Sequence, residues 1–441
     1  VFPSQDGKAI LANIPLDGNS LSKVLPNDKP VLPELIAALR ADIKPIAEAN
    51  GLAPYVTGPG GLLGDLFSAF GTLDSTLLLT TLGVVAIILI FVYRSPILWI
   101  IPLLSSMFAL STAGGIVYLL AKNNIIDVDG QSQGILSVLV IGAATDYALL
   151  LIARYREELH LHESRFDAMK SAYKGVWEPI LASGSTVSIS LLVLLFSQLT
   201  NTAGLGPIGA IGIVCAMITI LTLLPALLLL FGRWIFWPRR PHFDGDDHVM
   251  SGPWSKLANG IGRNPRKAWV VTGAVLLLLA FASTTLKADG IGTVDTFTGN
   301  PESVVGQKLL VTHFPGGEGD PTQIVVSADK IDAVTAAVES APGVTEIVPF
   351  VDPMTKVMKV VNNKAILNVT LDKAPDSVEA SNDIPKIREL AKSADATSLV
   401  GGTSAVYHDV RAANNRDNKT IIPIILLVIT IILGLLLRSI L

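Results

Sequence analysis

The segment GILSVLVIGAATDYALLLIARYREE, residues 134–158, is uncharged up to Ala153 except for one acid, Asp146, and it ends in a charged cluster that starts at Arg154. The uncharged run is long enough to cross a bilayer as a helix, which needs about 20 residues. A carboxylate near the bilayer centre costs roughly 2.5–3.5 kcal/mol, so such residues usually face a protein-lined or watery interior. Burial there favours the protonated form, which makes Asp146 a candidate for taking up and releasing a proton.

The composition extends this interpretation from one helix to the whole chain. Half of the residues are hydrophobic and 16% are charged, against about 25% charged in an average soluble domain. The apolar residues gather in long runs, so the sequence predicts a polytopic membrane protein. The predicted spans are 76–93, 97–121, 132–153, 178–200, 205–232, 268–286 and 420–441.

The distribution of basic residues predicts the orientation in the membrane. Arg94, the charged segment 154–175 and the segment 233–267 all fall on one side if the spans alternate. By the positive-inside rule this side is cytoplasmic. We expect an amphipathic surface helix over 154–175 and a cytoplasmic linker over 233–267. The two longer polar regions, 1–75 and 287–419, then lie outside the cytoplasm.

An internal repeat predicts the architecture. Residues 56–97 align without gaps on residues 400–441, with Gly58 on Gly402 and Asp65 on Asp409. Such a repeat predicts a second carboxylate helix beyond Leu441 and a whole protein of about twelve spans, built from two parallel halves. The chain therefore looks like a fragment that covers the middle of such a protein, with 420–441 beginning the second bundle.

The second polar region, 287–419, alternates strand and helix patterns. This alternation predicts an α+β domain with split βαβ units of the ferredoxin-like kind. Residues 1–75 would be the latter half of its twin. The predicted strands are 323–327, 344–351, 365–371 and 399–402, and the predicted helices are 328–340 and 377–392.

Several motifs resemble the MMPL (mycobacterial membrane protein large) family of the resistance-nodulation-division (RND) superfamily, in its actinobacterial type. They are Gly142-x-x-x-Asp146-Tyr147 with its Arg154-x-Arg156-Glu157-Glu158 continuation, Gly206-Pro207-x-Gly209-Ala210-x-Gly212, Leu223-Leu224-Pro225-Ala226-Leu227, Gly232-Arg233-Trp234-x-x-Trp237-Pro238 and Asn264-Pro265-Arg266. The resemblance covers the whole chain. It implies an RND-type transmembrane bundle, extracytoplasmic porter domains, proton-driven export of lipids or other amphiphiles, and a proton relay that includes Asp146 and Tyr147.

Two further groups of residues are weaker candidates. Ser183, Ser185 and Thr186 belong to a run of hydroxyls beside the carboxylate helix and could hold water near Asp146. Intramembrane hydroxyls more often permit close packing or bond to their own backbone. Gly206, Gly209 and Gly212 are candidate hinges for alternating access, with close helix packing as the first alternative.

No metal or cofactor is expected. The one cysteine, Cys215, excludes disulfides and thiolate metal sites. The acidic loop with His242, Asp244, Asp246, Asp247 and His248 lacks the spacing of a calcium loop. His162-x-x-x-x-Asp167 matches a short acyltransferase pattern but lies in a charged helix, where solvated side chains are the simpler interpretation.

The expected function is secondary active transport rather than catalysis, in the cytoplasmic membrane of a bacterium. We expect membrane lipids, protons, an amphiphilic substrate and other membrane proteins or further copies as partners, and no nucleic acid. A lipid-sensing or scaffolding protein without coupling is one alternative. A membrane acyltransferase that uses His162 and Asp167 is another.

Overall fold

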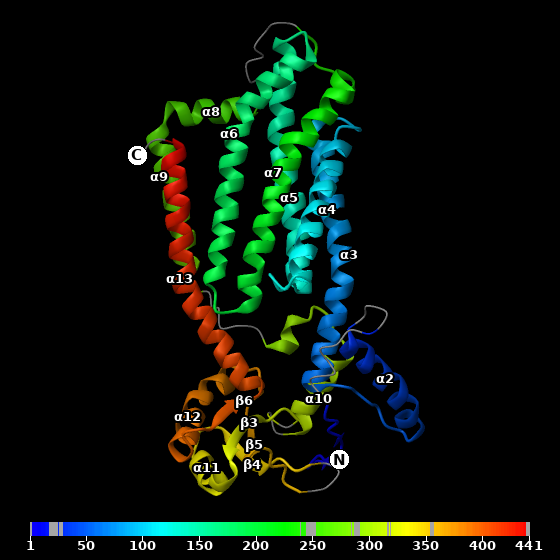
Figure 1. Cartoon of the computed structure of the whole chain (residues 1–441), viewed down its shortest axis with the longest axis vertical. Coiled ribbons are helices and arrows are strands. Elements are labelled where there is room, and N and C mark those ends of the chain that lie inside the picture. The colour runs from blue at the N-terminus through cyan, green and yellow to red at the C-terminus, as the bar shows by residue number, and fades with distance from the viewer. Residues whose placement is uncertain are drawn as a thin grey trace. The chain divides into compact units, whose positions relative to one another are not determined.

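Figure 1 shows the computed structural model of the chain, which divides into two compact units. The described residues are 2–16, 25, 30–238, 240–243, 253–283, 285, 292–314, 317, 319–352 and 357–437. The extramembrane unit comprises Val1–Thr72 and Asp289–Arg416. The membrane unit comprises Leu73–Ala288 and Asp417–Leu441.

Among the described residues, seven helices are long and apolar enough to cross a membrane, the number that the sequence predicts. They are α3 (Gly58–Tyr93), α4 (Ile100–Lys122), α5 (Gly130–Leu161), α6 (Arg165–Leu192) continued by η1 (Val193–Phe196), α7 (Thr200–Phe231) continued by η2 (Gly232–Phe236), α9 (Pro265–Ser283) and α13 (Thr403–Leu437). A shorter helix, α8 (Pro253–Arg263), precedes α9 in the chain.

Helices α4, α5, α6 and α7 pack against one another and form the core of the membrane unit (Figure 1). Their contacts bury small and branched side chains such as Ala144, Ala148, Ile208 and Ile220. Small residues let helix backbones approach closely, which is how helices associate in an apolar solvent. The described part of α9, by contrast, has no buried residue.

The predicted separate helix over 154–175 is wrong. Helix α5 continues to Leu161, and α6 already begins at Arg165. The Ser164 hydroxyl accepts a hydrogen bond from the Asp167 amide and caps α6. The guanidinium of Arg233 donates to the carbonyls of Leu159, His162 and Glu163 at the end of α5. These bonds satisfy carbonyls that have no partner within a helix, so the charged segment extends the two membrane helices.

The extramembrane unit contains the predicted ferredoxin-like βαββαβ arrangement. Its elements are β3 (Thr322–Ser327), α11 (Ile331–Glu339), β4 (Val344–Pro349), β5 (Lys364–Leu371), α12 (Val378–Ala394) and β6 (Leu399–Gly401). The strand order is β4-β5-β3-β6, and all neighbours are antiparallel. Ile324 and Val326 alternate with more exposed residues on β3 and join Leu367, Val369 and Ile384 in the core under α11 and α12.

The rest of the extramembrane unit comes from both ends of the chain. Near the beginning, β1 (Phe2–Pro3) pairs with β2 (Ile10–Leu11), and α2 (Val31–Ala49) follows them. In the order of the chain, η3 (Thr293–Thr296) and α10 (Glu302–His313) follow α9 and precede β3.

The internal repeat of the sequence is also a repeat of local structure. The aligned glycines Gly58, the first residue of α3, and Gly402, the residue before α13, have φ values of +75° and +94°, a conformation that favours glycine. Arg40 donates two hydrogen bonds to Asp65 and one to the Val56 carbonyl. Arg388 makes the same three bonds, to Asp409 and to the carbonyl of the aligned Val400. We call these two arrangements the first and the second arginine clamp.

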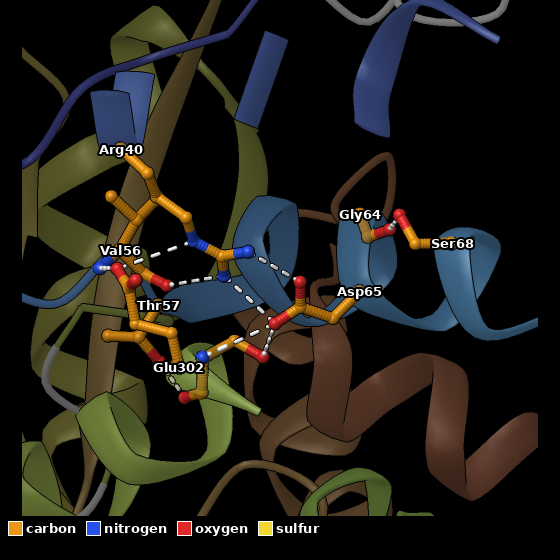
Figure 2. A network of polar contacts seen from close by, with 8 residues as sticks. Arg40, Val56, Thr57, Gly64, Asp65, Ser68 and Glu302 are labelled. Atoms are coloured by element: carbon orange, nitrogen blue, oxygen red, sulfur yellow. Dashed lines mark hydrogen bonds and ion pairs between the residues drawn. The ribbon is translucent and has the colours of Figure 1, made fainter. Parts of the chain in front are cut away.

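The first clamp is covered by the beginning of α10, whereas the second is open. Figure 2 shows Arg40 between Asp65 and Glu302, with the Arg40 Nε and the Glu302 carboxylate 3.3 Å apart. Asp65 also accepts the Ser303 hydroxyl at 2.5 Å and the Ser303 amide at 3.3 Å. The Asp409 side chain is 57% exposed, against 11% for Asp65.

Candidate functional site

A groove in the membrane unit contains the acid that the sequence singles out. It has a volume of about 520 Å³ and lies between α5, α6 and α7. Most of its lining is apolar. The lining residues are Val138, Leu139, Gly142, Ala143, Asp146, Tyr147, Leu150, Pro179, Ile180, Ser183, Val187 and Ile213.

Asp146 lies near the middle of α5, and its side chain is exposed on the face that carries the groove. Helix α5 begins at Gly130, where the Asp129 carboxylate accepts the amide of Ser132 at 2.6 Å and caps the helix. From there the helix runs without a break to Leu161. The carboxylate therefore stands far from both ends of the helix, in a groove that opens away from the packed core.

Tyr147 and Ser183 accompany Asp146 in this groove. Tyr147 is 7% exposed, and Ser183 on α6 lines the same groove as Tyr147 and Asp146. One carboxylate and two hydroxyls thus come together from two helices. Such a set can hold and pass a proton, because a hydroxyl both donates and accepts a hydrogen bond.

The other predicted hydroxyls are placed differently. Ser185 and Thr186 are not among the residues that line the groove. The Thr186 hydroxyl donates to the Ala182 carbonyl one turn earlier at 2.7 Å, which is the backbone bonding that competes with a relay role. Of the three hydroxyl candidates, Ser183 is therefore the one that the fold brings to Asp146.

The three candidate hinge glycines lie where α7 approaches its neighbours closely. A Cβ atom added at Gly206 would be 2.6 Å from the Leu191 carbonyl oxygen, and one at Gly212 would be 2.6 Å from a methyl carbon of Leu136. One at Gly209 would be 3.0 Å from Leu191. These contacts favour close packing as the role of the three glycines, and their role as hinges stays a prediction.

Gly206→Ala is expected to destabilise the membrane unit by about 1–3 kcal/mol, because the new methyl group meets a backbone carbonyl that cannot turn aside. The measurement is thermal unfolding in detergent. Gly115→Ala is the matched control, since a Cβ atom there has nothing within 4 Å. Equal melting temperatures for the two variants would contradict the packing role.

The two residues of the alternative acyl-transfer site have other partners in the structure. The Nδ1 atom of His162 lies 3.3 Å from a carboxylate oxygen of Glu158, while the Asp167 amide bonds to Ser164. No group of three metal-binding side chains occurs among the described residues. Of the acidic loop, Asp244, Asp246, Asp247 and His248 lie outside the described residues.

Sequence reasoning missed Asp417, a buried acid in the membrane unit. The carboxylate of Asp417 accepts the Ser197 hydroxyl at 2.5 Å and the Gln198 amide at 3.1 Å. These bonds join α13 to the loop that connects η1 with α7. The partners are 220 and 219 residues apart in the chain, so no local pattern announces the contact.

Comparison with known proteins gives a family and two informative relatives. The model of the MMPL family matches residues 1–268 and 297–441. A membrane protein of Streptomyces coelicolor, ActII-3, is 45% identical over 91% of this chain and 55% of its own length. An apo-petrobactin exporter of Bacillus anthracis is 31% identical over 88% of this chain and 55% of its own length. The chain thus spans about half the length of these curated relatives.

Among solved structures, a heavy metal efflux pump has 18% sequence identity and a TM-score of 0.39. The match covers 77% of this chain and 31% of that chain.

Proposed function

We propose, since the chain belongs to the MMPL family, that it forms the middle part of a proton-driven exporter of a lipid or other amphiphile. The chain is a multi-pass membrane protein: its relatives include proteins named membrane proteins, and seven of its described helices can cross a bilayer. The extramembrane unit would be the porter part, on the outer side of the bacterial cytoplasmic membrane. One relative's name, apo-petrobactin exporter, supports the outward direction.

The observation that carries the proposal is the grouping of Asp146, Tyr147 and Ser183 in the lining of one intramembrane groove. An ionisable residue within a membrane span marks an ion or proton pathway by default, because its cost would otherwise select against it. The groove provides room for water beside the carboxylate. A membrane potential of 100 mV supplies about 2.3 kcal/mol for each proton that crosses, and this free energy can bias a two-state rearrangement.

The exposed position of Asp146 gives the second half of the protein a role in the mechanism. In the chain itself the carboxylate faces outward from the packed helices. The internal repeat predicts a second carboxylate helix beyond Leu441. We propose that this helix covers the groove, shields the acid from lipid and completes the relay, which is also what the family resemblance implies.

The transport activity is testable in inside-out membrane vesicles that contain the full-length protein. A panel of fluorescent short-chain phospholipids serves as the probe, and respiration acidifies the vesicle lumen. The proposal expects that at least one probe accumulates in the lumen only while the proton gradient stands, and that an uncoupler stops the accumulation. If every probe accumulates to the same level with and without a proton gradient, the result would favour a sensor or scaffold without coupling.

Tyr147→Phe is expected to slow gradient-driven uptake by up to about tenfold, because it removes one hydroxyl from the relay, and a hydrogen bond contributes about 0.5–1.5 kcal/mol. The measurement is the initial rate of probe uptake in the same vesicles. Tyr118→Phe is the control, since Tyr118 on α4 is 63% exposed and is not part of the groove. A rate that falls equally in both variants would remove the specific role of Tyr147.

A further inference from the structure

The groove around Asp146 leads toward the ends of α5 and α6 that the basic residues predict to be cytoplasmic. On α6, Pro179 is the lining residue nearest the start of the helix, and Gly175 lies one turn before it. On α5, Leu150 is the last lining residue, and Arg154 lies one turn after it. Positions four apart are neighbours on a helix surface, so Gly175 and Arg154 mark the next turn beyond the groove.

The Arg154 side chain lies against α6 at this turn. A Cβ atom added at Gly175 would be 3.5 Å from the Arg154 Nε and 3.8 Å from its Cγ. The glycine has no side chain of its own, so the stem of the arginine reaches the surface of α6. Arg154 therefore bridges α5 and α6 one turn beyond the groove.

Two carboxylates hold the Arg154 guanidinium in this place. One terminal nitrogen lies 3.0 Å from Glu157, and the other lies 2.7 Å from Glu158. The Glu158 side chain is 3% exposed, and its second oxygen lies 3.3 Å from the Nδ1 atom of His162. A buried carboxylate that loses its cation is costly, so Glu158 restrains the position of Arg154.

Arg154 follows Asp146 by about two helical turns, which is about 12 Å at the rise of an α-helix. Both side chains belong to the same continuous helix, α5. In the proposed transport, a proton that leaves Asp146 along the groove toward the cytoplasm therefore meets Arg154 next.

A guanidinium interrupts a chain of hydrogen bonds. A proton passes along such a chain only through groups that both accept and donate, as water and hydroxyls do. The guanidinium has five N–H donors and no acceptor, and it stays protonated in proteins. Glu157 and Glu158 balance the charge of Arg154, so the barrier comes from the missing acceptor rather than from repulsion.

We propose that Arg154 is a strap that closes the predicted cytoplasmic end of the groove and stops protons from leaking through it when no substrate moves. The strap opens when α5 and α6 shift against each other, because its side chain belongs to one helix and lies against the other. The inference rests on the proposed proton coupling and adds to it the point at which the pathway is closed.

Proton leak through the full-length protein tests the strap. The protein is reconstituted into liposomes that enclose a pH-sensitive dye. A pH gradient is imposed without substrate, and potassium with valinomycin prevents a membrane potential. The measurement is the rate at which the gradient decays, at equal amounts of protein. The unaltered protein should add little to the decay in empty liposomes, because the strap is closed.

Arg154→Gln should speed the decay by at least about tenfold, because the new amide accepts as well as donates hydrogen bonds and the barrier falls. Arg154→Lys should keep the decay slow, since an ammonium group only donates. Arg165→Gln is the control: Arg165 is exposed at the start of α6, where its guanidinium lies 5.2 Å from the centre of the Phe166 ring. Decay as fast in Arg154→Lys or Arg165→Gln as in Arg154→Gln would overturn the proposal.

A second pair of variants opens the strap without removing a charge. Gly175→Leu puts a side chain where Arg154 lies and should also speed the decay. Gly115→Leu should not, because a Cβ atom there has nothing within 4 Å. Adding Asp146→Asn to Arg154→Gln should restore slow decay, since the path then lacks its proton carrier. Fast decay in this double variant would show that the protons take another route and would overturn the proposal.

The same preparations separate the strap from the proposed transport. Gradient-driven uptake by the unaltered protein, together with slow decay in Arg154→Gln and Gly175→Leu, would support the transport and reject the strap. Fast decay that depends on Asp146, without gradient-driven uptake by the unaltered protein, would support the strap and reject the transport.

Discussion

Asp146→Asn in the full-length protein is expected to abolish gradient-driven uptake of the amphiphile probe, with a loss of about a hundredfold or more. Asparagine has nearly the shape of aspartate but cannot take up or release a proton. Proton transfer by a positioned side chain contributes about 10²–10⁴-fold where it limits a rate. The measurement is the initial rate of uptake in energised inside-out vesicles, at equal amounts of protein in the membrane.

Two further variants make the result specific to Asp146. Asp127→Asn removes an exposed acid before α5, outside the groove, and should leave uptake unchanged. Asp146→Glu keeps the ionisable group and should retain part of the activity. Uncoupler-sensitive uptake that persists in Asp146→Asn would remove this carboxylate from the mechanism.

Arg40→Ala is expected to destabilise the region around α2 and the beginning of α3 by about 2–3 kcal/mol, because it leaves the largely buried Asp65 without its cation. Arg388→Ala breaks the same bonds at an exposed acid. It should cost less than about 1 kcal/mol in the 441-residue chain. Hydrogen exchange of the backbone amides in each clamp measures both effects. Equal losses would contradict the account of the covered and the open clamp.

The first clamp should also weaken in acid. Burial opposes the charge on Asp65, but the hydrogen bonds from Arg40 and Ser303 outweigh it and hold the pKa of Asp65 below its ordinary value of 3.8. Because the folded pKa is the lower one, the full contribution to stability is present above the unfolded pKa. It is lost as the pH falls through the folded value. The rate of amide exchange near α2 should therefore not depend on the titration of the Asp65 carboxyl group at neutral pH.

The sequence predicted the membrane helices and the α+β domain because both follow from periodic local patterns. A run of about 20 apolar residues commonly crosses a membrane as a helix, because a helix makes the hydrogen bonds of its backbone internally. The alternating strand and helix patterns over 287–419 are also local, so they predicted which elements follow one another in the chain from β3 to β6. The failure at 154–175 arose because charged residues also extend a helix beyond the membrane, as they do at the ends of α5 and α6.

The parts that the sequence could not predict depend on contacts between distant residues. The repeat aligned Asp65 with Asp409, but nothing local indicated that Glu302 and Ser303 cover one of them and leave the other exposed. Asp146 could be singled out as a candidate from the cost of a carboxylate in a membrane, and its role stays a prediction. Its neighbour Ser183 required the packing of α6 on α5, since several hydroxyls of α6 were equally good candidates.

Proton movement driven by the amphiphile itself tests the central claim most directly. The full-length protein is reconstituted into liposomes that enclose a pH-sensitive dye, and the transported phospholipid probe is added outside without any pH gradient. In the molecules whose cytoplasmic side faces outward, inward movement of the probe should expel protons, so the lumen becomes more alkaline. Asp146→Asn should show no change. A probe that enters with no change in pH in the unaltered protein would contradict a relay through Asp146.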